Sequence, residues 1–98
     1  MGKSKIAILG AGESGVGAAI LARKLGMEVW VSDKGAIKEK YTSMLRKYNI
    51  PFEQGIHTDE KILDAGEVIK SPGIADKEPL IKKIKHNGIP LISEIEFA

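Results

Sequence analysis

The stretch Ile6-Ala7-Ile8-Leu9-Gly10-Ala11-Gly12-Glu13-Ser14-Gly15 decides the fold of this chain. Its apolar first part, Ile6 to Leu9, is typical of a buried strand. Gly10, Gly12 and Gly15 follow with the G-x-G-x-x-G spacing, and a helical pattern comes next. In such a loop the first glycine permits a tight turn, the second lets a phosphate approach the main chain, and the third lets helix and strand pack closely. Because the start of a helix presents unpaired N–H groups, the stretch predicts a site for a diphosphate.

The rest of the chain alternates between strand and helix patterns. Further strands are predicted at 28–32, 52–54, 67–70 and 91–92, and helices at 16–25, 37–48, 58–63 and 80–84. Strands that alternate with helices indicate a parallel sheet with right-handed crossovers. We therefore predict an α/β fold with a Rossmann-like five-stranded parallel sheet, order 3-2-1-4-5, flanked by four helices. The 98 residues are expected to form one domain.

Three loops are predicted to meet at one edge of this sheet. They are Gly10–Gly15, Asp33-Lys34-Gly35 and Ser71-Pro72-Gly73, and each follows a predicted strand. Ligands of such sheets bind beyond the carboxyl ends of the strands, where the strand order reverses. Asp33 lies near the position of the acid that accepts a ribose hydroxyl in dinucleotide-binding folds. It also suits another nucleoside, or a simple turn, and Pro-Gly is itself common turn chemistry.

Composition excludes several classes of function. The net charge is only +2 and the lysines are interspersed with acids, which argues against a nucleic-acid surface. There is no cysteine, and the two histidines, His57 and His86, do not have metal-ligand spacing. We expect His57 to be a solvated loop residue and Trp30 to pack in the core. Neither a membrane span nor a signal peptide is indicated, so a cytoplasmic protein is expected.

The chain as a whole contains no recognisable catalytic set. It lacks a Ser-His-Asp order, paired carboxylates with an evident cleft, and a G-x-x-x-x-G-K-[ST] loop for ATP. No catalytic residue and no metal ligand is predicted. The sequence favours a binding module.

Four segments together resemble the N-terminal domain of the Mur ligases. They are Gly10-Ala11-Gly12-Glu13-Ser14-Gly15, Val31-Ser32-Asp33, Ile69-Lys70-Ser71-Pro72-Gly73-Ile74 and Ile92-Ser93-Glu94-Ile95-Glu96-Phe97. The resemblance covers essentially the whole chain. The Ser-Pro-Gly-Ile element and the Ser-Glu-Ile-Glu-Phe ending are most similar to the branch of the family that adds D-glutamate.

The resemblance implies a function in bacterial peptidoglycan precursor synthesis. Enzymes of this branch use ATP and Mg²⁺ to convert the alanyl carboxylate of UDP-MurNAc-L-Ala into an acyl phosphate, which the amine of D-glutamate attacks. The N-terminal domain would hold the UDP part of that substrate. The chain would then be the first domain of a longer enzyme that continues into central ATP-binding and C-terminal domains, and it would be inactive as a ligase by itself.

The resemblance also assigns roles to individual residues. Glu13 and Ser14 would lie near uridine and diphosphate, Asp33 and Lys34 at the uracil, and Ser71, Pro72 and Gly73 against the nucleotide. With the loop glycines, the expected UDP-binding residues are Gly10, Gly12, Glu13, Ser14, Gly15, Asp33, Lys34, Ser71, Pro72 and Gly73. Glu13 stands where relatives can have an apolar residue, and Gly35 lacks the side chain that some relatives have after the acid.

Two other functions remain open on the sequence alone. One is a small NAD-binding regulatory module, since Asp33 suits NAD as well as uridine. The other is an interaction domain in which the glycine turn is only structural. The elements around Ser71 and Glu94 favour the ligase domain over both.

Overall fold

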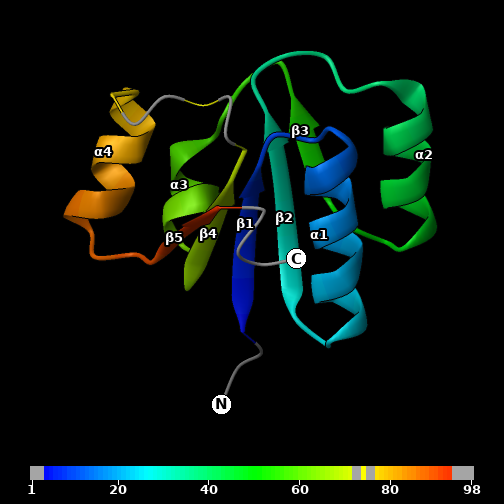
Figure 1. The fold of residues 1–98 in the computed structure, drawn as a ribbon, viewed down its shortest axis with the longest axis horizontal. Coiled ribbons are helices and arrows are strands. Elements are labelled where there is room, and N and C mark those ends of the chain that lie inside the picture. Colours follow the sequence, from blue (N-terminus) through cyan, green and yellow to red (C-terminus); the bar gives the residue numbers. More distant parts are fainter. Residues whose placement is uncertain (1–3, 72–73, 75–76, 94–98) are drawn as a thin grey trace.

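The computed structural model describes residues 4–71, 74 and 77–93, and strands alternate with helices throughout this part of the chain. The elements are β1 (Lys5–Leu9), α1 (Glu13–Lys24), β2 (Glu28–Asp33), α2 (Glu39–Lys47), β3 (Phe52–Gln54), α3 (Asp59–Leu63), β4 (Glu67–Lys70), α4 (Pro79–His86) and β5 (Leu91–Ser93). The strands form one parallel sheet in the order β3-β2-β1-β4-β5 (Figure 1). This order confirms the predicted fold class.

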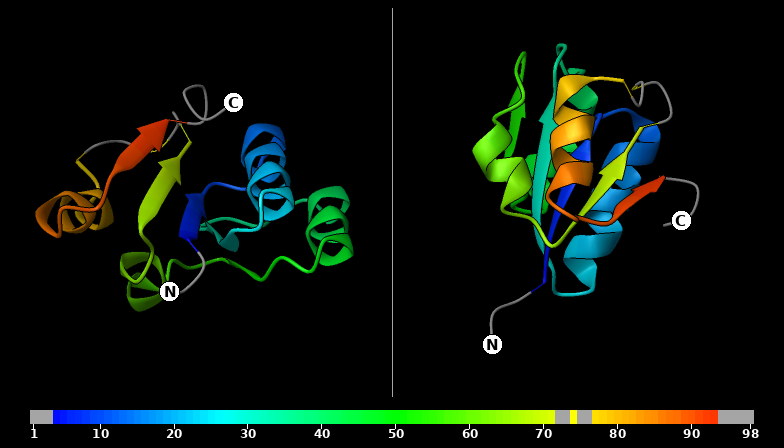
Figure 2. Two further views of the ribbon diagram at one scale, coloured as in Figure 1. Left: turned by 90° about the horizontal axis from the view of Figure 1, so that it is seen from below. Right: turned by 90° about the vertical axis from the view of Figure 1, so that its left-hand side faces the viewer.

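Strand β1 lies at the centre of the sheet and contributes to a core on each face. Ile6 and Ile8 point into the core under α1 and α2, while Ala7 and Leu9 point into the core under α3 and α4. All four side chains are completely buried, as the unbroken apolar run requires. Figure 2 shows the two helix pairs on opposite sides of the sheet. The sheet is therefore a central layer covered on both faces, and its carboxyl edge faces the connecting loops.

Helix α1 begins earlier than the sequence predicted. The sequence predicts a helical pattern over 16–25 and a helix start within 14–17, but the helix runs from Glu13, and the N–H of Val16 donates to the Gly12 carbonyl oxygen at 2.9 Å. Gly12 has an extended backbone (φ −83°, ψ −166°), which ends the loop and lets the helix start at the next residue. Glu13, Ser14 and Gly15 are thus the first turn of a helix rather than part of the loop.

The ends of other helices follow from local chemistry. Gly26 and Asn49 have positive φ angles (85° and 57°) one residue beyond the C-caps of α1 and α2, a conformation that glycine and asparagine favour at helix ends. Thr58 precedes α3 as expected, but its hydroxyl does not cap the helix; it donates to Oε1 of Glu53 at 2.5 Å. In the described part of the chain, no helix is long and apolar enough to cross a membrane.

Candidate functional site

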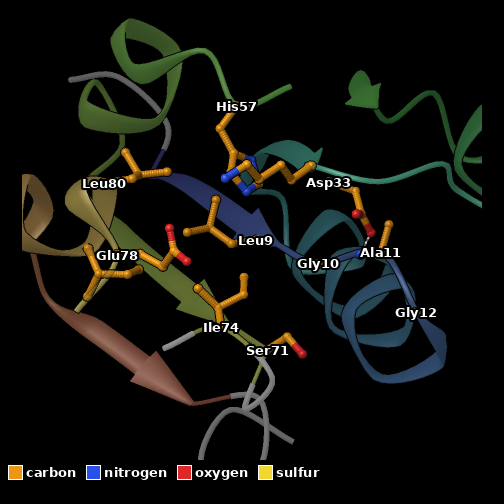
Figure 3. A pocket seen from close by; sticks show the side chains of 12 residues that line it. Leu9, Gly10, Ala11, Gly12, Asp33, His57, Ser71, Ile74, Glu78 and Leu80 are labelled. Carbon is orange, nitrogen blue, oxygen red and sulfur yellow. Dashed lines mark hydrogen bonds between the residues drawn. The ribbon is translucent and has the colours of Figure 1, made fainter. Parts of the chain in front are cut away.

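A cavity of about 390 Å³ lies at the carboxyl edge of the sheet (Figure 3). Its size is within the range of small-molecule sites. Loops after β1, β2, β3 and β4 surround it, together with the start of α4. It is lined by Leu9, Gly10, Ala11, Gly12, Asp33, Lys34, His57, Ser71, Ile74, Glu78, Leu80 and Ile81. Gly10, Asp33 and Ser71 therefore meet at one edge of the sheet, as predicted.

The first glycine of the loop is required for two separate reasons. Gly10 has φ +100°, which L side chains rarely adopt, and a Cβ placed on it would lie 2.8 Å from Cβ of Ser71. Backbone hydrogen bonds hold the three loops at this spacing. The N–H of Gly10 donates to the Ser32 carbonyl oxygen at 2.9 Å, and the N–H of Ser71 donates to the Leu9 carbonyl oxygen at 3.0 Å.

The carboxylate of Asp33 fixes the shape of the glycine-rich loop. Its Oδ2 accepts a hydrogen bond from the N–H of Ala11 at 2.8 Å, and its Oδ1 accepts one from the N–H of Gly35 at 2.9 Å. The first bond joins the loop after β2 to the loop after β1, and the second closes a turn after the acid. The turn was one of the roles that the sequence left open for Asp33, whereas the bond to the loop after β1 was not predicted.

The first turn of α1 adds donors beside this cavity. The backbone N–H groups of Glu13, Ser14 and Gly15 precede the first intrahelical bond of α1 and have no acceptor within the helix. A Cβ at Gly12 would meet nothing within 4 Å, so the main chain there is open to a ligand. Glu13 is exposed, and neither it nor Ser14 nor Gly15 lines the cavity itself.

The structure thus brings part of the predicted site together. Gly10, Gly12, Asp33, Lys34 and Ser71 line one cavity, and Glu13, Ser14 and Gly15 lie next to it at the start of α1. Pro72 and Gly73 lie outside the described residues, as do the Ser-Glu-Ile-Glu-Phe positions from Glu94 onward.

The expectation that His57 is a solvated loop residue is wrong. Its imidazole is half-buried and points into the cavity (Figure 3). Its Nδ1 lies 2.6 Å from the hydroxyl of Ser32, which is completely buried at the end of β2. The Ser32 hydroxyl also donates to Oε2 of Glu53 at 2.8 Å. A hydrogen-bonded chain of His57, Ser32 and Glu53 therefore forms part of the cavity wall and its support.

Burial and hydrogen bonding set the charge states of His57 and Glu53. Burial raises the pKa of Glu53, but the hydrogen bonds that Thr58, Ser32 and Trp30 donate to its carboxylate outweigh burial, so the pKa lies below its ordinary value of 4.5. Burial lowers the pKa of His57 below 6.5, because it disfavours the charged imidazolium; Glu53 and Asp33 oppose this effect and Lys34 adds to it. At neutral pH, Glu53 is a carboxylate and His57 a neutral imidazole.

Sequence reasoning also missed the apolar wall of the cavity. Leu9, Ile74, Leu80 and Ile81 line it, and Glu78 lies beside them at the start of α4. The signal for Ser32 was a polar residue within an otherwise apolar strand. No local signal marked the apolar wall, because these residues also read as ordinary core. Among the described residues there is no group of histidine and acidic side chains that could hold a metal ion.

Comparison with known families identifies the chain. The family model for the N-terminal domain of MurD-like Mur ligases matches residues 4–93. The chain belongs to this family. The MurD-like chain is 60% identical over 94 residues to the UDP-N-acetylmuramoylalanine--D-glutamate ligase of Bacteroides thetaiotaomicron, covering 96% of this chain and 21% of that enzyme. It is 58% identical to the ligase of the same name from Christiangramia forsetii, over 100% of this chain and 22% of that enzyme. It thus spans about a fifth of the length of these relatives.

Solved structures of two other ligases superpose on the MurD-like chain. It superposes with a TM-score of 0.85 on a murein peptide ligase from Psychrobacter arcticus, at 25% identity over 96% of this chain and 20% of that one. The UDP-N-acetylmuramate-alanine ligase of Thermotoga maritima gives a TM-score of 0.80 at 26% identity, over 95% of this chain and 21% of that one. The gentamicin-biosynthesis protein GenD2, solved with NAD, matches at 17% identity with a TM-score of 0.61, over 95% of this chain and 27% of that one, and shows the shared fold alone.

Proposed function

We propose that this MurD-like domain binds the UDP part of UDP-MurNAc-L-Ala within a longer, ATP-dependent D-glutamate ligase of the bacterial cytoplasm. Such an enzyme would act in peptidoglycan precursor synthesis, and so in cell-wall biogenesis, cell shape and division. The names of the relatives support the reaction class. The observation that carries the binding proposal is the cavity in which the Asp33-bound glycine loop and the loop at Ser71 converge, beside the start of α1.

The start of α1 suits the diphosphate of a nucleoside diphosphate, and the loop at Asp33 suits its nucleoside. The unpaired N–H groups of α1 and the open main chain at Gly12 favour the diphosphate, which the partial positive charge of a helix start stabilises. Asp33 and Lys34 would contact the nucleoside. Ser71 lines the cavity, and it would lie against the nucleotide together with Pro72 and Gly73.

ATP and Mg²⁺ are expected to bind outside this domain. The sequence contains no G-x-x-x-x-G-K-[ST] loop, and the described residues form no metal-binding cluster. In the proposed enzyme, both would be bound by the central domain of the longer chain, which relatives about five times as long have room for. The part played by this domain is to hold and orient the nucleotide end of the substrate.

Calorimetric titration of the chain with UDP, UDP-MurNAc-L-Ala and NAD tests the proposal. We expect weak binding of both uridine ligands and weaker or no binding of NAD. Affinity is expected to be low because one domain supplies few contacts to offset the entropy lost on association. Tighter binding of NAD than of UDP would overturn the proposal and favour the regulatory module instead. Absence of binding by every ligand would favour the purely structural glycine turn.

A further inference from the structure

The chain of His57, Ser32 and Glu53 has only one consistent arrangement of protons. Glu53 is ionised, so its oxygens only accept hydrogen bonds. They receive the N–H of Thr58 at 2.7 Å, the Thr58 hydroxyl at 2.5 Å and the indole N–H of Trp30 at 3.3 Å. The single hydroxyl proton of Ser32 points to Oε2 of Glu53 at 2.8 Å rather than to the Ile56 carbonyl oxygen at 3.3 Å, since otherwise lone pairs of Ser32 and of the carboxylate would face each other across the shorter contact.

This arrangement determines which nitrogen of His57 carries the proton. Because Ser32 donates to Glu53, its oxygen must accept from Nδ1 of His57, 2.6 Å away. The neutral ring is then protonated on Nδ1, and Nε2 is an acceptor. No hydrogen bond to Nε2 is formed within the described part of the chain, and the ring points into the cavity (Figure 3). The cavity therefore has a preset acceptor held in place by a buried serine and a carboxylate.

The surroundings of this acceptor suit the edge of a flat base. Leu9, Leu80 and Ile74 line the cavity and provide apolar surface for a ring. Lys34 also lines the cavity, close enough to His57 for its charge to disfavour protonation of the ring. An ammonium donor and an imidazole acceptor thus lie at one site. Uracil presents the complementary edge, in which the N3–H donor lies between two carbonyl oxygens.

We propose that His57 determines base specificity at this cavity by accepting, through Nε2, a hydrogen bond from the N3–H of uracil. Ser32 and Glu53 are positioning residues that act through the imidazole. This inference rests on the proposed function, because it assumes that the cavity takes a uridine nucleotide. It explains why a serine is completely buried at the carboxyl end of β2, where an apolar residue would complete the core equally well.

Nitrogen-15 NMR of the imidazole tests the proton arrangement without any ligand. At pH 7.5 we expect the proton of His57 on Nδ1. The charged groups around the ring are Glu53, Asp33, Lys34 and Asp59. Ser32→Ala removes the acceptor for Nδ1–H and should shift the ring toward the Nε2–H form. A proton on Nε2 in the unsubstituted chain would overturn the inference, whatever the chain binds.

Titration with modified uridine diphosphates tests the contact itself. The 3-methyl derivative of UDP lacks the N3–H, while the 5-methyl derivative keeps it and adds the same group elsewhere on the ring. We expect the 5-methyl derivative to bind like UDP and the 3-methyl derivative to bind about tenfold more weakly or worse, because the acceptor is left unpaired. Equal weakening by both methyl groups would show a steric effect and overturn the inference.

Two substitutions of His57 separate its nitrogens. His57→Gln keeps an acceptor near the place of Nε2 and should keep the preference for UDP over the 3-methyl derivative. His57→Asn keeps a donor near the place of Nδ1, and we expect it to bind UDP about 3- to 10-fold more weakly with little preference. A full preference in His57→Asn, while the unsubstituted chain binds UDP, overturns this inference alone. Failure of the unsubstituted chain to bind UDP overturns the proposed function as well.

Discussion

At the scale of single residues, Asp33 combines a structural and a binding role. The carboxylate that is predicted to contact a nucleoside also accepts hydrogen bonds from the N–H groups of Ala11 and Gly35. Each carboxylate oxygen keeps a further lone pair, so these bonds do not prevent contact with a ligand. They do mean that the shape of the glycine-rich loop depends on the same side chain that would bind the nucleoside.

Asp33→Ala is therefore expected to weaken both the fold and binding. Loss of the charge-assisted bond to the nucleoside should cost about 1.5–3 kcal/mol of binding free energy, which corresponds to a roughly 10- to 100-fold lower affinity for UDP. Loss of the bonds from Ala11 and Gly35 should lower the free energy of unfolding. Calorimetry measures the affinity, and urea unfolding measures the stability. Asp59→Ala is the control, because Asp59 forms an exposed ion pair with Lys83 at 2.6 Å and lies outside the cavity lining. A UDP affinity unchanged by Asp33→Ala would contradict the assignment.

The side chains of His57 and Glu53 make the free energy of unfolding depend on pH in two separate ranges. The pKa of His57 is lower in the folded chain, so the unfolded chain takes up this proton first, and the free energy of unfolding falls as the pH drops below about 6.5. The pKa of Glu53 is also lower in the folded chain, so its contribution is present above about pH 4.3 and is lost as the pH falls through the folded pKa.

Urea unfolding from pH 8 down to well below pH 4 measures both effects. In His57→Gln the dependence in the upper range should flatten, while the dependence in the lower range remains because Glu53 still accepts from Thr58 and Trp30. The same upper-range slope in His57→Gln as in the unsubstituted chain would assign that slope to other groups.

At the scale of elements, two glycines with open space around them, one just before α1 and one within it, have different expected roles. A Cβ at Gly12 or at Gly17 would meet nothing within 4 Å. Gly12 precedes the helix and lines the cavity, whereas Gly17 lies within α1, is exposed and does not line it. Substitutions at Gly12 and Gly17 therefore distinguish an effect on ligand access from an effect on the stability of the helix.

Gly12→Val should block the approach of a diphosphate while leaving the fold intact, because the backbone there is extended and suits a branched residue. We expect UDP affinity to fall by more than about tenfold, since the helix start is no longer accessible. Gly17→Ala should leave binding unchanged and stabilise the chain by about 0.5–1 kcal/mol. Calorimetry and thermal unfolding of both variants check this pair. Normal UDP binding by Gly12→Val would place the diphosphate elsewhere.

At the scale of the whole molecule, two cores of different composition cover the two faces of one sheet. The core under α1 is built with small residues such as Ala18, Ala19 and Ala22, which let the helix approach the sheet closely. The core under α3 and α4 uses larger residues, Ile62, Ile81 and Ile84. The cavity opens at the carboxyl edge between these layers, so one scaffold positions loops that are far apart in the sequence.

This scaffold by itself is expected to bind without catalysing ligation. We predict no phosphate release from ATP when the chain is incubated with Mg²⁺, UDP-MurNAc-L-Ala and D-glutamate. Acyl-phosphate formation needs a metal–phosphate clamp, and the described residues form no metal-binding cluster. The full-length ligase of Bacteroides thetaiotaomicron serves as the positive control. Phosphate release above a protein-free control, abolished by a substitution within this chain, would contradict the prediction.

The sequence by itself determined the order of elements, the strand order and the edge at which the ligand loops meet. Each depends on local signals: the apolar run before Gly10, the alternation of strand and helix patterns, and the handedness of parallel crossovers. Helix starts were less accurate, because the glycines at 12 and 15 suggested a loop where the first turn of α1 lies.

Only the tertiary structure revealed the hydrogen bonds that hold Asp33 and His57 in place and the apolar side chains that line the cavity. The bond from Ala11 to Asp33 spans 22 residues, and the contact from His57 to Ser32 spans 25. No pattern within one element encodes such a pair, because the partners become neighbours only when the sheet assembles. His57 was assigned to solvent for this reason: its burial and its charge state come from Ser32 and Glu53, which other strands bring to it.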